Sequence, residues 1–175
     1  NEIYFEENNK ELKYTTFAKN YRIFSIDHQS YYESSIKIFV ENKLIGVGPK
    51  LFREKCKNKK YQTKLKHNGG LIADGCQTHP HNTYLQLLSE TGVIGTIPVL
   101  FLFLYWFKLL FVHVYGKYMN SKHNLENYSL FLLIPMFIIL FPIIPSSNIF
   151  SSWNSFFIYF IIGFLIKDRF KWLKK

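Results

Sequence analysis

The sequence predicts an all-α polytopic membrane protein, in which a mostly helical external segment, residues 1–90, precedes three transmembrane helices. Two observations favour this class. Residues 1–90 hold 14 basic and 10 acidic side chains, whereas residues 91–175 hold 8 and 2, although the whole chain has a net charge of +10. The second part also contains three apolar windows near the length of about 20 residues that a bilayer core requires. A single soluble domain is therefore excluded, and 18 Phe, 12 Tyr and 3 Trp exclude intrinsic disorder.

The three apolar windows define the expected spans. The first runs from Val93 to Val114, so residues 91–116 are assigned to a transmembrane helix. The second and third cover about residues 128–145 and 149–166 and are joined by the sequence PSSN. Such a short polar joint predicts a tight turn, and residues 128–166 are expected to form a transmembrane helical hairpin.

The positively charged connections set the expected orientation. The tail, residues 167–175, has five basic residues and one acidic residue, and the connection 117–127 is also basic. Because Lys and Arg are enriched in cytoplasmic loops, both segments are predicted to be cytoplasmic and residues 1–90 to lie outside. The sequence starts without a Met or a secretion signal, so we expect further spans upstream and interpret the chain as the C-terminal part of a larger protein. The alternative is a complete three-span protein.

The external segment contains both cysteines, Cys56 and Cys76, which bracket a basic stretch that predicts an extended loop. Outside the cytoplasm such a pair favours a disulfide, although two separate thiols are the alternative. Earlier in the segment, apolar residues recur at helical spacing and predict one apolar helix face, which begins at a cap supplied by Asp27 or Ser30. The residues of this face are Tyr32, Ile36, Phe39 and Val40.

The most informative stretch covers residues 78–96. Asn82 is a good N-cap for a helix from Thr83 to Glu90, and Gly92 is a good end for it. His81 is then placed at a helix N-terminus, where the helix dipole favours a neutral imidazole and an anion beside it, so His81 is a candidate base with room for a phosphate. His79 is either directed elsewhere or shares one site with His81.

Two other interpretations of these histidines stay open. One is purely structural, with His81 as part of a cap and His79 there by chance. The other is a zinc site formed by His28, His79, His81 and Glu90, although neither an HExxH nor a CxxC spacing is present.

The run HPHNTYLQLLSETGVIG, preceded by LIGVGPKLFREKC, closely resembles the signature of the O-antigen ligase and O-antigen polymerase superfamily. The resemblance implies a multi-pass protein of the bacterial inner membrane, of which this chain represents the periplasmic loop and the last spans. It implies a GT-C-like glycosyltransferase of about ten to twelve spans. The implied reaction is an inverting glycan transfer from undecaprenyl diphosphate to an acceptor hydroxyl, with no metal and no cofactor. His81 corresponds to the general base.

The resemblance also suggests which residues bind the donor diphosphate or the substrate. Many relatives have an arginine where this chain has His28, so Arg53 is the best remaining arginine, with Lys50 and Arg22 behind it. For each cation, a solvated surface charge is the alternative. Residues near the base complete the predicted set: His79, Asn82 and Glu90.

The implied partners are the lipid-linked glycan donor, an acceptor that is lipid A core or another glycan, and membrane lipids. Nucleic acid is not expected outside the cell. Ligase, repeat-unit polymerase and protein oligosaccharyltransferase share this loop, and the sequence does not separate them. A hypothesis from another class is a non-catalytic membrane protein whose basic residues, between Lys50 and Lys66, bind polyanions.

Overall fold

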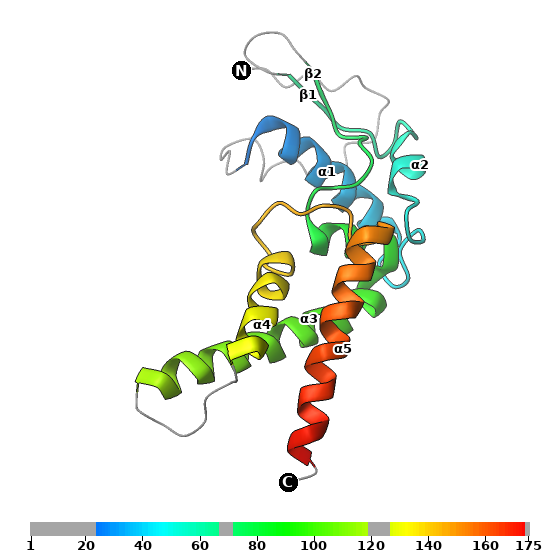
Figure 1. The fold of residues 1–175 in the computed structure, drawn as a ribbon. Coiled ribbons are helices and arrows are strands. Elements are labelled where there is room, and N and C mark those ends of the chain that lie inside the picture. Colours follow the sequence, from blue (N-terminus) through cyan, green and yellow to red (C-terminus); the bar gives the residue numbers. More distant parts are fainter. Residues whose placement is uncertain (1–23, 67–71, 119–126, 174–175) are drawn as a thin grey trace.

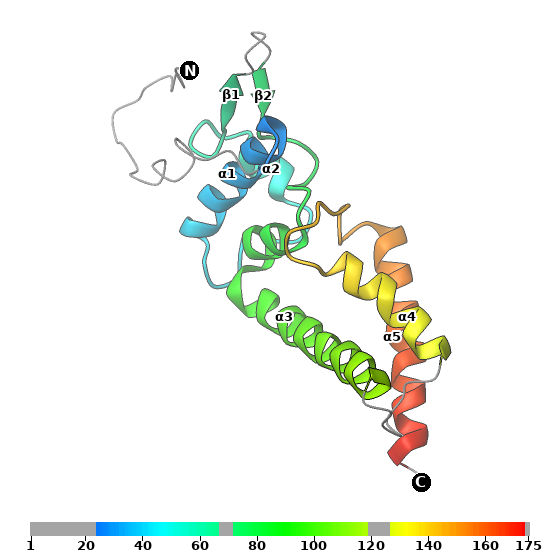
Figure 2. The same ribbon diagram turned by 90° about the vertical axis from the view of Figure 1, so that its left-hand side faces the viewer.

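The computed structural model describes residues 24–66, 72–118 and 127–173. Figures 1 and 2 show two parts: α1, α2 and a β-hairpin lie together at one end, and the longer part of α3 extends away from them with α4 and α5. The elements in chain order are α1 (Ile26–Glu41), α2 (Phe52–Cys56), β1 (Lys64–Lys66), β2 (Ile72–Asp74), α3 (Thr83–Tyr118), α4 (Asn127–Ile139) and α5 (Ser152–Leu173).

The fold is mostly helical, as expected, but the all-α prediction is wrong in one place. Strands β1 and β2 pair antiparallel within the stretch predicted as an extended loop, with Lys64 opposite Asp74. In the structure a disulfide joins Cys56, at the end of α2, to Cys76, just after β2, with the two Cα atoms 5.4 Å apart. The disulfide therefore ties the hairpin to α2, and it closes a loop between residues 20 positions apart.

Helix α1 begins at a different cap and buries a different face from those predicted. The hydroxyl of Ser25 accepts a hydrogen bond from the His28 N–H and caps the helix, whereas the Ser30 hydroxyl donates to the Asp27 carbonyl. Of the predicted apolar face, Tyr32 is buried and Ile36 is 43% exposed. The buried residues of α1 are Ser30, Tyr32, Ser34, Ser35 and Ile38.

Short serine side chains explain why this face is the buried one. A Cβ atom on Gly75, just after β2, would collide with the hydroxyl of Ser34 and the backbone of Ser30. On the other side, the Ser35 hydroxyl donates to the Leu85 carbonyl of α3, with an O···O distance of 2.8 Å. Close backbone approach, rather than hydrophobic periodicity, therefore decides how α1 packs.

Helix α3 is two helices joined at a break. Gly92 has φ 65° and ψ −167°, which are not helical, so the predicted end of the first helix at Gly92 is confirmed. A helix break leaves carbonyls before it and N–H groups after it without helical partners. Here the loop formed by residues 43–48 supplies those partners on both sides of the break.

Four backbone hydrogen bonds fix this loop to the break. Before it, the Ser89 carbonyl accepts from the N–H of Val47 at 3.0 Å, and the Glu90 carbonyl accepts from the N–H of Gly48 at 2.8 Å. After it, the N–H groups of the next two residues donate to loop carbonyls: Val93 to Lys43 at 2.8 Å and Ile94 to Leu44 at 3.1 Å. The loop thereby supplies partners for two carbonyls before the break and two N–H groups after it.

The second part of the molecule has its own apolar core between α3, α4 and α5, formed by Phe103, Trp106, Leu133, Met136, Leu140 and Ile161. Among the described residues, one helix is long and apolar enough to cross a bilayer, Thr83–Gly116, and it contains the first predicted span. The other two predicted spans correspond to shorter apolar helices, Leu130–Ile139 and Ser152–Phe164. Crossing by these two helices stays a prediction, as does the orientation.

The tight turn predicted at PSSN is wrong. Helix α4 ends at Ile139 and α5 begins at Ser152, so the connection covers residues 140–151. It packs on the first half of α3, where polar side chains hold it: the Asn82 amide donates to the Pro142 carbonyl at 2.7 Å, and the Gln86 amide donates to the Asn148 side-chain oxygen at 2.8 Å. Helix α5 then continues to Leu173, through most of the segment predicted as a separate basic tail.

Alanine at Gly92 tests the break. A Cβ there would collide with the Leu44 carbonyl, and φ is in the left-handed region, so we expect Gly92→Ala to lower the stability by about 1–3 kcal/mol. The control is Gly163→Ala in α5, where nothing lies within 4 Å of an added Cβ. Thermal unfolding in detergent should show a lower melting temperature for Gly92→Ala alone. Equal melting temperatures for the two variants would contradict the break.

Candidate active site

His81 lies two residues before the start of α3, in a backbone conformation that few residues other than glycine adopt, with φ 56°. Two contacts hold it there. The N–H of Ser146, in the connection 140–151, donates to the His81 carbonyl at 2.9 Å. Asn82 is the predicted N-cap, which is confirmed: its side-chain oxygen accepts from the N–H groups of Tyr84 and Leu85, each at 3.1 Å. The position of His81 is thus fixed by α3 and by the connection together.

Three histidines and one tyrosine form a cluster at this point. The ring centroid of His81 lies 4.0 Å from that of His79, 5.2 Å from that of Tyr31 and 5.9 Å from that of His28. His28 and Tyr31 come from the first turns of α1, and the other two rings precede α3. We call these four residues the histidine cluster. The sequence left open whether His79 and His81 point apart or share one site, and in the structure they share one site.

The environment of His81 favours the neutral form of its imidazole. Its side chain is half-buried, and burial lowers the pKa of His81 below its ordinary value of 6.5, with the nearby His28 adding to the shift. The predicted neutral imidazole agrees with this direction. The cause is different, because burial contributes most and the sequence had suggested the helix dipole.

His79 is the most buried ring of the cluster, at 9% exposure. Its Nδ1 is 2.9 Å from the Thr78 hydroxyl, and its Nε2 is buried with no hydrogen-bond partner among the described residues. Burial lowers the pKa of His79, His81 adds to the shift, and the Ser146 backbone opposes it. Two neighbouring imidazoles are therefore both favoured in their neutral forms.

The anion site expected at the N-terminus of α3 is partly occupied by the protein itself. Asn82 takes the N–H groups of Tyr84 and Leu85, so these donors are not free to bind a phosphate. The Asn82 amide also donates to Pro142, and the residue is 7% exposed. Asn82 fits a role in positioning His81 better than the expected contact with a substrate.

Glu90 lies at the end of the first half of α3 and is fully buried. Its carboxylate accepts from the backbone N–H groups of Lys50 at 3.0 Å and Phe52 at 3.1 Å, and from the Gln86 amide at 3.2 Å. The first two bonds fix the turn before α2, where Lys50 has φ 63° and an exposed side chain. This geometry gives Glu90 a scaffolding role, and Lys50 enters it through its backbone.

These contacts also bear on the zinc alternative, which needed Glu90 beside the histidines. Both oxygens of Glu90 instead accept hydrogen bonds from the backbone of Lys50 and Phe52, at the start of α2, and from the Gln86 side chain of α3. Within residues 24–66, 72–118 and 127–173, no group of three or more His, Cys, Asp or Glu side chains is arranged to hold a metal ion.

A comparison with protein families identifies the segment that carries the cluster. Residues 28–100 match the family model described as O-antigen ligase. The match of this segment supports membership of the O-antigen ligase family. The match begins at His28 in α1 and ends in α3, beyond the break at Gly92. No protein of curated function and no solved structure matches the chain significantly.

The match to the O-antigen ligase family indicates a ligase or polymerase type of function and, broadly, a membrane glycosyltransferase. It also indicates a membrane setting and a lipid-linked glycan in general terms, which agrees with the apolar helix Thr83–Gly116. The whole histidine cluster lies inside the matched segment.

Two features of the site differ from what sequence reasoning could supply. Arg53 is exposed on α2, and its side chain makes no hydrogen bond or ion pair within the described residues, so its expected place at the diphosphate stays a prediction. Tyr31 was not predicted, although it follows His28 by three residues and therefore shares its helix face. Its meeting with His81 depends on how α1 packs against α3.

Proposed function

We propose that the protein transfers a glycan from undecaprenyl diphosphate to an acceptor hydroxyl, with His81 as the general base. One observation carries the proposal: within the segment that matches the O-antigen ligase family, a half-buried imidazole of lowered pKa lies among His28, Tyr31 and His79. A general base must be unprotonated at working pH and within reach of a substrate proton. Burial favours the first condition, and partial exposure of His81 permits the second.

The unprotonated ring nitrogen of His81 takes the proton of the acceptor hydroxyl while that oxygen attacks the anomeric carbon of the donor. The bond from this carbon to the diphosphate oxygen breaks, and undecaprenyl diphosphate leaves with the electron pair. The configuration at the anomeric carbon is inverted. The proposal uses no metal and no cofactor.

Cations must stabilise the charge that develops on the leaving diphosphate. His28 is the candidate that lies inside the cluster, 5.9 Å from the His81 ring. Arg53 and Lys50 are exposed, on α2 and just before it, where a diphosphate bound from outside the protein can meet them. We propose these three residues as the diphosphate contacts.

Two aromatic rings of the cluster complete the proposed site. Tyr31 is half-buried, and its ring lies 5.2 Å from His81, so a sugar held near the base can pack on the flat ring. His79 presents a buried, unpartnered Nε2 beside the same base. We propose that Tyr31 orients a sugar and that His79 binds the substrate next to His81, whereas Asn82 and Glu90 position the loops around them.

The acceptor decides which member of the family this protein is. We propose a ligase that uses lipid A core, in lipopolysaccharide biosynthesis at the bacterial inner membrane. Residues 1–90 are then periplasmic and the C-terminus cytoplasmic. A repeat-unit polymerase or a protein oligosaccharyltransferase uses the same chemistry on a different hydroxyl. A glycan ladder on gels separates the ligase from the polymerase.

His81→Ala is expected to reduce transfer by about 100-fold or more, because a general base contributes at least that factor. The measurement is the glycan ladder on gels, with the full protein expressed in a host that lacks its own copy. Gln77→Ala is the control, an exposed residue on the same approach to α3. Both variants should reach the membrane in equal amounts.

The ladder has three informative outcomes. Ladders on lipid A core that only wild type and Gln77→Ala restore support the ligase. If wild type instead lengthens chains that another enzyme attaches, the protein is a polymerase. Normal transfer by His81→Ala would contradict the mechanism, and salt-sensitive binding of anionic polysaccharide by that variant would favour the polyanion-binding alternative.

The pH dependence of transfer is expected to report on His28. Burial and His28 lower the pKa of His81, so the base stays unprotonated, and transfer persists, somewhat below pH 6.5. In His28→Gln the pKa of His81 should rise, and the acid limb of the rate profile should move to higher pH. The position of the acid limb is the pH at which the rate falls to half of each variant's own maximum, so a lower maximal rate in His28→Gln does not change this reading. Lys59→Gln, which removes an exposed charge, should leave the limb in place. A limb that moves to lower pH in His28→Gln would contradict this account.

A further inference from the structure

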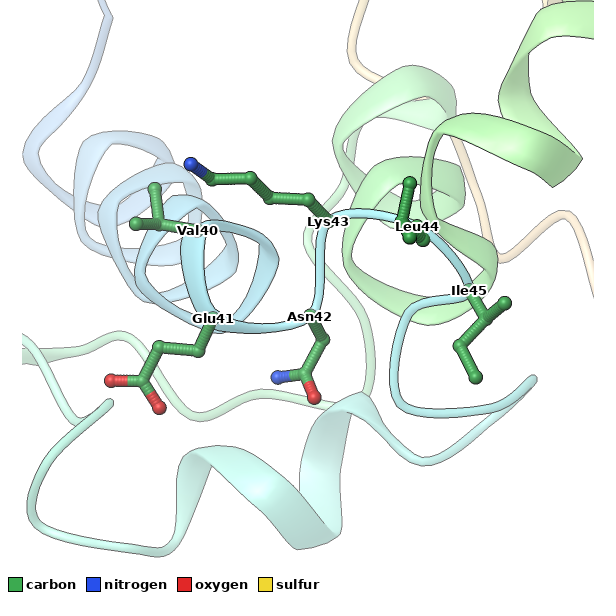
Figure 3. Close-up of a pocket in the computed structure, with 6 residues that line it drawn as sticks. All are labelled: Val40, Glu41, Asn42, Lys43, Leu44 and Ile45. Atoms are coloured by element: carbon green, nitrogen blue, oxygen red, sulfur yellow. The ribbon is translucent and has the colours of Figure 1, made fainter.

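Two large aliphatic side chains of the loop 43–48 are exposed. Leu44 is 68% exposed and Ile45 is 73% exposed, and both lie on a loop that backbone hydrogen bonds join to α3. We call Leu44 and Ile45 the apolar tip. Figure 3 shows them beyond Asn42 on the turn that leads from α1 to α2. In water, such a pair of exposed aliphatic side chains is unfavourable.

The height of the apolar tip along α3 is fixed by backbone hydrogen bonds. The carbonyl of Leu44 accepts from the N–H of Ile94, and the carbonyl of Lys43 accepts from the N–H of Val93. These N–H groups belong to the first turn of the apolar helix that follows Gly92. A Cβ on Gly46 would collide with the Glu90 backbone, so the loop can approach α3 this closely only with glycine there. The tip is therefore level with the start of the apolar helix.

The exposed surface of α3 continues from the tip. Apolar residues follow at spacings of three and four, which place them on one helix face. Their exposed fractions range from 43% to 67%, and they are Ile94, Ile97, Phe101 and Leu104. If α3 crosses the bilayer, this face meets lipid, and the apolar tip lies where the face begins.

A cation adjoins the tip. Lys43 is exposed, and in Figure 3 its side chain leaves the loop in a different direction from that of Ile45. Residues 40–45 also line a surface hollow of about 400 Å³. A lysine beside inserted aliphatic side chains is the pattern of a membrane-interface anchor, because the ammonium group can pair with lipid phosphate while the apolar groups enter the acyl region.

We propose that Leu44 and Ile45 insert into the lipid leaflet that α3 enters, at the boundary between headgroups and acyl chains, with Lys43 on the headgroup phosphates. The occupant is lipid because the tip is continuous with the outward apolar face of α3 and is held level with its first turn. This inference is independent of the proposed chemistry and depends only on α3 crossing the membrane. Its consequence is that the break at Gly92 is anchored to the bilayer surface.

Site-specific fluorescence tests the insertion. The full protein is reconstituted in vesicles of phosphatidylcholine and phosphatidylglycerol, and the environment-sensitive dye NBD is attached to Ile45→Cys or, separately, to Leu44→Cys. Labelling without reductant spares Cys56 and Cys76, which are joined, and labelled wild type gives the background. Lys59→Cys, at an exposed position after α2, is the control. The quenchers are lipids with a doxyl group near the headgroup and aqueous iodide.

At positions 44 and 45 we expect the doxyl lipids to remove most of the fluorescence and iodide to remove little. Position 59 should show the reverse. Iodide quenching at 44 and 45 as strong as at 59 would show that the tip is in water and would overturn the inference. Protection from both quenchers would show that protein covers the tip and would overturn it as well. Neither result bears on His81, so this test and the glycan ladder fail independently.

Discussion

The hydrogen-bonded break at Gly92 is the constraint on which the rest of the structure depends. A continuous helix from Thr83 to Tyr118 would satisfy its own backbone and leave the loop 43–48 without partners. With the break, the loop accepts from Val93 and Ile94 and donates to the carbonyls before Gly92. The loop connects α1 to α2, so the break also fixes where α1 can lie against α3.

The buried carboxylate of Glu90 extends this arrangement one step further. It accepts the N–H groups of Lys50 and Phe52, so the turn into α2 is fixed from the same end of the helix. A buried carboxylate without hydrogen-bond donors is strongly unfavourable, and donors placed around it therefore select one arrangement of the chain. The disulfide joins α2 to the chain just after β2. Because Glu90 fixes the start of α2, it also helps to fix the position of the β-hairpin.

A second constraint acts on the other end of the same helix. The connection 140–151 lies against the first half of α3, where the side chains of Asn82, Thr83 and Gln86 are buried and hydrogen-bonded to it. Buried polar groups that are all satisfied specify one geometry, because any slip leaves several of them unpaired. His81 directly precedes these residues, and Ser146 holds its carbonyl. The helices beyond the break thus help to place the histidine cluster through their connection.

Local signals explain what the sequence could predict. The Asn82 cap, the end at Gly92 and the first long apolar helix each depend on residue types within a few positions, and the structure contains all three. The serine face of α1 could not be predicted from an apolar period, because it exists only opposite Gly75 and Leu85. The meeting of His28 and Tyr31 with His81 depends on that packing. The docking of the connection 140–151 likewise depends on partners about 60 residues away.

Hydrogen exchange at the break tests the central claim most directly. The N–H groups of Val47 and Gly48 lie in an irregular loop, and those of Val93 and Ile94 start a helix turn, where amides normally exchange quickly. Because all four are hydrogen-bonded across the break, the account predicts that they exchange slowly in wild-type protein, together with the first half of α3. Rapid exchange at these four positions, with slow exchange kept in the rest of α3, would contradict it.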